Sequence, residues 1–280
     1  SPSGADKGCF VFQLRKPVGV VGAIIGWNYP LWMAVIKVAP AIAMGNSIVL
    51  KPSEFSALSA CKLAGLALEA GIPPGVFNLI NGQGETIGSA LAHHQDVNLL
   101  SFTGSSATGK RLMIAAGQSN MKRLMLECGG KSPYIVFEDC PNDMEFIADD
   151  IIDKAFPNQG ERCIAGTRLL VHKSLKEKLL QIILEKIESI TPQDPLDPSA
   201  TFGALINESH MNKVLAYISS GESEGAKLIY GGRRICVEGC ENGYYIEPAI
   251  FDEVDPSQKI AREEIFGPVL SVFTFEDEEE

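Results

Sequence analysis

Residues 18–30 read VGVVGAIIGWNYP, a short apolar run followed by a turn and by a proline that suits the start of a helix. The pattern then repeats, with strands expected at 18–25, 47–50, 76–80, 99–102 and 123–127 and helices at 31–44, 56–70, 85–92 and 107–116. Buried strands that alternate with crossover helices are typical of βαβ units. The sequence therefore predicts the α/β class, with an open, mostly parallel, twisted sheet over residues 1–126.

The same rhythm restarts after residue 131, with strands expected at 134–137, 167–171, 228–230 and 269–275 and helices at 144–156, 174–190 and 208–221. A connector rich in proline and aspartate lies at 191–198. The chain has 280 residues, which exceeds the usual size of a single domain. We therefore expect a second α/β domain over residues 127–280.

Composition and charge exclude several classes of protein. The chain is 45% hydrophobic and 21% charged, as globular proteins are. Its 24 Lys and Arg residues against 35 Asp and Glu residues give a net charge of -11, which disfavours nucleic acid as a partner. No apolar run reaches the roughly 18 residues of a spanning helix, so we expect no association with a membrane.

Cysteine usage indicates the cellular compartment. The chain has seven cysteines, an odd number, without a C-x-x-C pair or a cluster of cysteine and histidine. This pattern favours neither a disulfide framework nor a metal site. We therefore expect a cytoplasmic protein with reduced thiols and no bound metal.

Polar motifs follow the strands of the predicted parallel sheet. They are the pair 27–28, the segments 51–54, 82–84 and 103–105, and Glu127. Ligands of such sheets bind beyond the carboxyl ends of the strands, where these motifs would meet. The sequence therefore predicts a ligand site along this edge.

Lys51 and Glu54 follow the second strand. A carboxylate at such a place can accept hydrogen bonds from ribose hydroxyls and would repel a 2′-phosphate, which favours NAD over NADP. The ammonium of Lys51 could bind ribose or tolerate the phosphate, so NADP is the alternative. Alternatively, the two residues form only a solvated surface ion pair, which would stabilise the fold by about 0–1 kcal/mol and have no role in ligand binding.

Residues 104–109 read GSSATG at a strand-to-helix junction. Backbone N–H groups at the start of a helix can hold a phosphate, and Gly104 and Gly109 would allow its close approach. A helix cap with a tight turn explains the same residues equally well. Gly82, Gly84 and Gly88 miss the G-x-G-x-x-G spacing by one residue, so a standard dinucleotide fingerprint is absent.

Residues 158–163 read NQGERC and carry the strongest chemical signal of the chain. Cys163 alone would be assigned to the core, but its polar neighbours predict a turn where backbone N–H groups can face an oxyanion. Glu127 could activate water, and the amide of Asn28 could donate to an oxyanion or cap a helix. Together these residues predict covalent catalysis through a thioester.

In this order the motifs resemble the aldehyde dehydrogenase superfamily over essentially the whole chain. The segments that carry the resemblance are 17–20 (PVGV), 27–30 (WNYP), 51–54 (KPSE), 102–105 (FTGS), 127–131 (ECGGK), 158–163 (NQGERC) and 264–268 (EIFGP). The resemblance implies a cofactor-binding domain over residues 1–126 and a catalytic domain over 127–280. It also implies oxidation of a small-molecule aldehyde to the acid with NAD or NADP.

The resemblance implies a role for individual residues. Cys163 would be the nucleophile, Asn28 and the Cys163 backbone N–H the oxyanion donors, and Glu127 the base that activates the deacylating water, whereas Lys131 would not be a nucleophile. Gly109 comes from the glycine motif above, and the cofactor contacts implied by the resemblance are Ile25, Gly26, Trp27, Lys51, Glu54, Gly84, Gly104, Ser105 and Glu264.

Two departures from the family pattern matter. Cys128 stands where the family often has leucine, which puts a second thiol beside Glu127. Family members are also considerably longer than this chain. By the resemblance, the chain begins near an oligomerisation hairpin at residues 10–15 and stops shortly after Glu264. We therefore expect a fragment with little or no activity alone, taken from a protein that forms a homo-oligomer.

Two alternatives keep the same fold. A CoA-acylating aldehyde dehydrogenase transfers the acyl group to CoA and does not need Glu127 as a base. A non-catalytic relative would serve in binding or assembly, although Cys163, Glu127 and Asn28 are all present.

Overall fold

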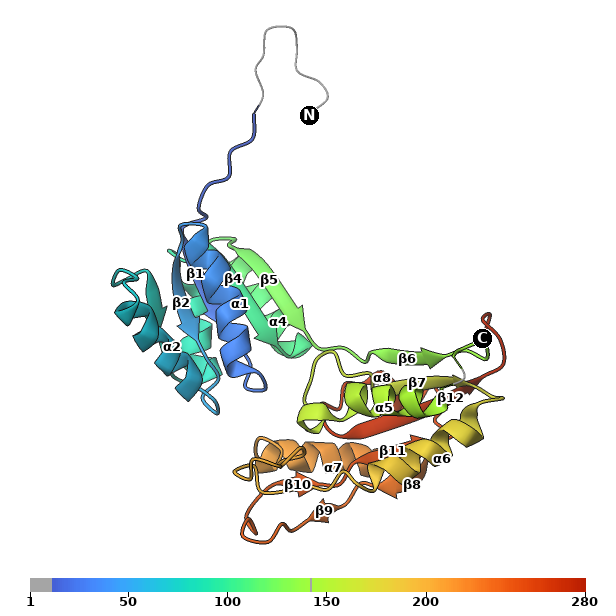
Figure 1. The fold of residues 1–280 in the computed structure, drawn as a ribbon. Coiled ribbons are helices and arrows are strands. Elements are labelled where there is room, and N and C mark those ends of the chain that lie inside the picture. Colours follow the sequence, from blue (N-terminus) through green and yellow to red (C-terminus); the bar gives the residue numbers. More distant parts are fainter. Residues whose placement is uncertain (1–11, 142) are drawn as a thin grey trace, which may run out of the picture. The chain divides into compact units, whose positions relative to one another are not determined.

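The structure is a computed structural model that describes residues 12–141 and 143–280 (Figure 1). The chain divides into two compact units, Ser1–Cys128 and Gly129–Glu280. The boundary expected from the sequence, between residues 126 and 127, lies beside this division. The functional roles given to the two parts stay predictions.

The first unit is built on a five-stranded parallel sheet in the order β3-β2-β1-β4-β5. Its elements in chain order are β1 (Val20–Ile24), α1 (Pro30–Ala43), β2 (Ser47–Lys51), α2 (Leu58–Glu69), β3 (Phe77–Leu79), η1 (Gly84–Gly88), α3 (Ser89–His93), β4 (Leu99–Gly104), α4 (Ser106–Gln118) and β5 (Arg123–Cys128). The strand order reverses at β1, and the predicted parallel α/β architecture is confirmed.

Local sequence explains why α1 begins and ends where it does. Pro30 occupies its first turn, where a missing N–H costs nothing, and Gly45 adopts a φ of 77° just beyond its end. The helix buries Met33, Ala34 and Val38 in one hydrophobic core with strand residues of the sheet. Spacing of about 3.6 residues per turn puts these side chains on one face.

One helix prediction was wrong in detail. The sequence predicts a single helix over 85–92, but the structure has a π-helical turn, η1, followed by the short α3. Gly82 precedes this turn with a φ of 149°, which only glycine adopts readily. Such π-helical turns are frequent at functional sites, and periodicity alone does not reveal them.

The second unit contains a five-stranded mixed sheet in the order β6-β7-β12-β11-β8. Among the described strands of this sheet, only β8 runs antiparallel to its neighbour, and β9 and β10 form a separate antiparallel pair. The elements are β6 (Pro133–Val136), α5 (Met144–Ala155), η2 (Pro157–Gly160), β7 (Arg168–His172), α6 (Lys176–Ile187), α7 (Glu208–Ser223), β8 (Lys227–Gly231), β9 (Arg234–Ile235), β10 (Tyr245–Ile246), β11 (Ala249–Asp252), α8 (Lys259–Arg262) and β12 (Val269–Phe275).

Both faces of this second sheet are covered. Leu270 and Val272 of β12 pack in one core with α5 and α6, whereas Val269 packs in another with α7 and α8. Side chains of a strand alternate between the two faces, so neighbouring residues enter different cores. Figure 1 shows α5 and α6 together beside the strands of this unit.

The short elements β9, β10, β11 and α8 are absent from the sequence-based prediction. β9 and β10 have two residues each, too few to produce a period. Residues 12–17 form no regular element, and residues 10 and 11 of the expected hairpin lie outside the described residues. No helix in the described part of the chain is long and apolar enough to cross a bilayer.

Candidate active site

The carboxyl ends of the parallel strands in the first unit bring the predicted motifs to one edge. Ile24 pairs with Lys51 on one side and with Phe102 on the other, and Thr103 pairs with Glu127. The segment after β1 therefore begins beside the ends of β2 and β4. A Cβ atom on Gly26 would lie 3.8 Å from the carbonyl oxygen of Thr103 and 3.2 Å from Oδ1 of Asn28.

Lys51 and Glu54 form an ion pair at this edge. The Nζ atom of Lys51 lies 3.1 Å from Oε2 of Glu54, and the lysine side chain is 3% exposed against 42% for the glutamate. Burial acts to raise the pKa of Glu54, but hydrogen bonds from its own backbone, Lys51 and the Gly84 backbone outweigh it and lower the pKa. Lys51 is thus not a solvated surface cation, and the carboxylate is held ionised.

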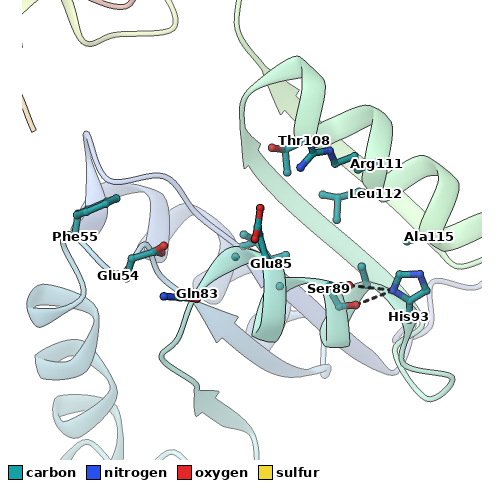
Figure 2. A pocket seen from close by; sticks show the side chains of 14 residues that line it. Glu54, Phe55, Gln83, Glu85, Ser89, His93, Thr108, Arg111, Leu112 and Ala115 are labelled. Carbon is teal, nitrogen blue, oxygen red and sulfur yellow. Dashed lines mark hydrogen bonds between the residues drawn. The ribbon is translucent and has the colours of Figure 1, made fainter. Parts of the chain in front are cut away.

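A cavity of about 970 Å³ opens beside Glu54 (Figure 2). It has the size of a small-molecule site. Its lining residues come from the end of β1, from the segment after β2, from η1 with the residue before it, from α3, and from one face of α4. They are Ile24, Glu54, Phe55, Gln83, Gly84, Glu85, Gly88, Ser89, Ala92, His93, Thr108, Arg111, Leu112 and Ala115.

Most of these lining residues were not predicted from the sequence. Figure 2 shows Thr108, Arg111 and Leu112 along the α4 helix, across from Glu54. With Ala115 they follow the i, i+3, i+4, i+7 spacing of a single helix face. The sequence does show this spacing, and it shows that the helix starts directly after a strand. Together these two features could have predicted the lining residues on α4.

The glycine motif at 104–109 begins α4. The Oγ atom of Ser105, the N-cap, accepts a hydrogen bond from the Thr108 backbone N–H at 3.2 Å. Gly109 is buried one turn inside the helix, where its N–H donates to the Ser105 carbonyl and a Cβ would lie 2.9 Å from Sγ of Cys128. The helix cap therefore exists, and cofactor contacts of these residues stay predictions.

Lys37 is a buried cation that was not predicted from the sequence. It lies on the inner face of α1, and its Nζ donates to Oγ of Ser101 at 2.8 Å. Burial lowers the pKa of Lys37, while the charge of Glu127 opposes the shift. Its position in a helix otherwise rich in apolar residues is the sequence feature that could have predicted a buried lysine.

In the second unit, Cys163 follows the η2 turn and precedes β7. It is a half-buried free thiol. The segment around it is tied to the end of α5, because Arg162 Nη1 donates to the Asp153 carbonyl at 3.3 Å and the Gly166 N–H donates to the Lys154 carbonyl at 3.2 Å. The predicted turn is thus present at the cysteine.

Glu264 lies beside the 129–131 segment. Its Oε1 accepts a hydrogen bond from the Gly130 N–H at 3.3 Å. Burial raises the pKa of Glu264, against the effects of that N–H and of Lys213 and Lys131. Burial and the charge of Arg168 lower the pKa of Lys131 to about 7, although Glu264 opposes the shift.

The sequence matches the aldehyde dehydrogenase family over residues 2–280. The chain belongs to this family. A curated relative, the NADP/NAD-dependent aldehyde dehydrogenase PuuC of Escherichia coli (strain K12), is 48% identical over 267 residues, which are 95% of this chain and 52% of that protein. The chain thus spans about half the length of this aldehyde dehydrogenase.

Solved aldehyde dehydrogenases have the same fold. KauB from Pseudomonas aeruginosa matches with a TM-score of 0.91 and 54% identity, over 94% of this chain and 52% of that chain. Betaine aldehyde dehydrogenase from Staphylococcus aureus, solved with NAD+, matches with a TM-score of 0.90 and 39% identity, over 94% and 52% of the two chains. The resemblance stated from the sequence is confirmed.

The predicted catalytic residues are distributed over both units. Asn28 and Glu127 belong to the first unit, and Cys163 belongs to the second. The predicted cofactor contacts Ile25, Gly26, Trp27, Lys51, Glu54, Gly84, Gly104, Ser105 and Gly109 lie in the first unit, and Glu264 lies in the second. Among residues 12–141 and 143–280, no group of His, Cys, Asp and Glu is arranged to hold a metal ion.

Proposed function

We propose that the protein containing this chain oxidises an aldehyde to a carboxylic acid with NAD(P)+, through a thiohemiacetal and a thioester on Cys163. The match to the aldehyde dehydrogenase family over residues 2–280 carries this proposal. The half-buried thiol in a turn supports it, because a thiol nucleophile needs both access and fixed orientation.

In the first half of the reaction, Cys163 adds to the carbonyl carbon as a thiolate. The side-chain amide of Asn28 and the Cys163 backbone N–H donate to the oxygen that becomes negative. When that oxygen re-forms a carbonyl, the carbon loses hydride, and the acyl group remains bound to sulfur as a thioester. Bound NAD(P)+ supplies the acceptor for the hydride.

In the second half, Glu127 removes a proton from water as the water attacks the thioester carbon. The carbon–sulfur bond breaks, the acid leaves, the Cys163 thiolate is restored, and Glu127 releases its proton to solvent. Lys37 lies on the inner face of α1, and the charge of Glu127 acts against the lowering of the Lys37 pKa by burial.

We assign the nucleoside end of the cofactor to the cavity between Glu54 and α4. The ionised Glu54 carboxylate fits the ribose hydroxyls, and Gly84 offers open space where a Cβ would otherwise project. The same carboxylate would repel a 2′-phosphate, which favours NAD, with NADP as the alternative.

The assembly and compartment of the protein are also proposals. Exposed apolar side chains on α4 and β5, such as Ile114 and Met125, support a homo-oligomer. None of the six cysteines in the described residues forms a disulfide, which supports the cytoplasm.

The test uses the protein encoded by the complete reading frame. Short, aromatic and amino aldehydes are supplied with NAD+ or NADP+, and reduced nicotinamide and free acid are measured. We expect both products in equal amounts, and a loss of about 1,000-fold or more in kcat/KM for Cys163→Ala. Lys173→Ala, an exposed cation in the second unit, is the control and should leave the rate unchanged.

Two outcomes would contradict the proposal. Acyl-CoA in place of free acid, when CoA is added, would assign the protein to the CoA-acylating class. Reduction of neither cofactor by any aldehyde, or equal rates in the wild-type protein and Cys163→Ala, would indicate a binding or assembly role.

A further inference from the structure

The turn that precedes Cys163 has an unusual backbone. Asn158 and Gln159 have φ values of 52° and 55°, and Gly160 follows with 68°. Left-handed conformations of residues other than glycine cost of order 1–3 kcal/mol each and persist only where their surroundings hold them. The surroundings of this turn therefore determine where the sulfur atom lies.

A second strained residue faces this turn. Phe266, in the segment that follows Glu264, has a φ of 61°. The two segments touch at Gly160, where a Cβ atom would collide with the carbonyl oxygen of Gly267. The cysteine turn and the 264–268 segment are thus packed backbone against backbone.

Glu161 and His210 connect these segments through side chains. The Glu161 side chain is 4% exposed, and its Oε1 accepts a hydrogen bond from the Ile206 N–H at 3.3 Å. The same oxygen lies 3.5 Å from Nε2 of His210. That nitrogen is 2.7 Å from the carbonyl oxygen of Phe266, so it carries the hydrogen and donates to the strained residue.

Burial favours the uncharged forms of both the Glu161 carboxyl and the His210 imidazole. Burial raises the pKa of Glu161 to about 8, although the Ile206 N–H acts against the rise. Burial and the charge of Lys213 lower the pKa of His210, although its bond to Phe266 opposes this. At neutral pH the pair is therefore a carboxylic acid and a neutral imidazole, and an amide would preserve the acceptor oxygen of the acid.

We propose that Glu161 and His210 are positioning residues, which hold the Cys163 turn against the 264–268 segment and so fix the sulfur atom relative to it. The proposal rests on the proposed function, in which Cys163 is the nucleophile. Neither residue touches the reacting atoms in this role. Glu161 acts on the turn because it directly follows Asn158–Gly160, and His210 acts on Phe266 through the hydrogen bond to its carbonyl oxygen.

The experiment compares Glu161→Gln, Glu161→Leu and His210→Phe in the full-length protein. Leucine removes the acceptor, and phenylalanine keeps a ring but removes the donor. His172→Phe is the matched control, because His172 is a second buried histidine whose contacts, to Ser174, Glu276, Glu138 and Phe275, lie elsewhere in the unit. Kinetics and amide hydrogen exchange of residues 156–166 are measured for each protein.

We expect Glu161→Leu and His210→Phe to lower kcat about tenfold or more and to speed exchange in 156–166 by a similar factor, because the turn is released. The KM for the aldehyde should stay within about threefold. Glu161→Gln should restore kcat and exchange to within about twofold of the wild-type protein. His172→Phe should leave the exchange of 156–166 unchanged.

The proposal is overturned if Glu161→Leu and His210→Phe keep both kcat and local exchange within twofold of wild type. It is equally overturned if exchange rises evenly over residues 129–280, or if Glu161→Gln behaves like Glu161→Leu. Should Glu161→Leu fail to fold, Glu161→Gln and His210→Phe decide. Failure of the proposed function is distinguishable, because exchange is measured whether or not an aldehyde is oxidised.

Discussion

Glu127 and Cys163 illustrate what individual residue types reveal. A carboxylate at the end of a strand and a thiol in a polar turn were predicted from their chemistry, and the structure contains both the strand end and the turn. Lys37, Glu161 and His210 were not predicted. Their significance comes from burial and from contacts between distant residues, which a linear sequence does not display.

Replacing the base should separate the two halves of the reaction. In Glu127→Gln we expect one equivalent of reduced cofactor per active site to form quickly and turnover then to slow by about 100- to 10,000-fold, because the thioester waits for water. Rapid-mixing absorbance measures the burst, and mass spectrometry of the protein detects the acyl group on Cys163. Steady turnover at the wild-type rate would remove Glu127 from this role.

Glu161 should make stability depend on pH. The folded protein holds its proton up to about pH 8, whereas the unfolded chain releases it above an ordinary pKa of 4.5. The stabilisation is therefore fully present below the unfolded pKa and is lost as pH rises through the folded one. Between these values the melting temperature of the wild-type protein should fall relative to that of Glu161→Gln.

Differential scanning calorimetry of the two proteins across this pH window measures that difference. The comparison isolates one group, because all other titratable groups are shared. A difference that stays constant with pH would show that the Glu161 carboxyl is ionised in the folded protein.

Among the elements, α4 both has a side-chain cap at its first turn and lines the cavity. Ser105 caps the helix, and the same helix presents Thr108, Arg111 and Leu112 to the cavity. The sequence left a cap and a phosphate site as equal alternatives. The structure contains the cap, and a cap also orients the N–H groups that a phosphate would need.

Two substitutions at Ser105 separate these contributions. Ser105→Ala should cost about 1 kcal/mol of unfolding free energy, and Ser105→Gly only a few tenths, because glycine is a tolerated N-cap. If backbone N–H groups hold the cofactor phosphate, Ser105→Gly should keep the Kd for NAD+ close to wild type in calorimetric titration. A large loss of affinity in both variants would instead assign the hydroxyl a direct contact.

At the scale of the whole molecule, apolar side chains are exposed on the first unit. In the described part of the chain β5 is an edge strand, and Met125 on it is 59% exposed, while Ile114 on the adjacent α4 is exposed to the same extent. Edge strands with apolar side chains favour pairing with another chain. The net charge of -11 would oppose that pairing at low salt.

Met125→Lys should therefore weaken association. We expect sedimentation velocity of the full-length protein to show an oligomer whose dissociation constant rises about tenfold or more in this variant, because a charge is placed at an apolar contact. Phe146→Lys, an exposed apolar position in α5 of the second unit, is the matched control. An unchanged oligomer in both variants would remove β5 from the interface.

The α/β class, the alternation of strands and helices through α4 apart from the 85–92 helix, and the chemical character of Asn28, Glu127 and Cys163 follow from the amino-acid sequence. Those features depend on periods of a few residues and on side-chain chemistry, which are local. The strand order, the π-helical turn at η1, the cavity lining along α4 and the contact of Glu161 with His210 became visible only in the folded chain. These depend on residues far apart in the chain, and packing, rather than local preference, selects among the arrangements that the same local pattern allows.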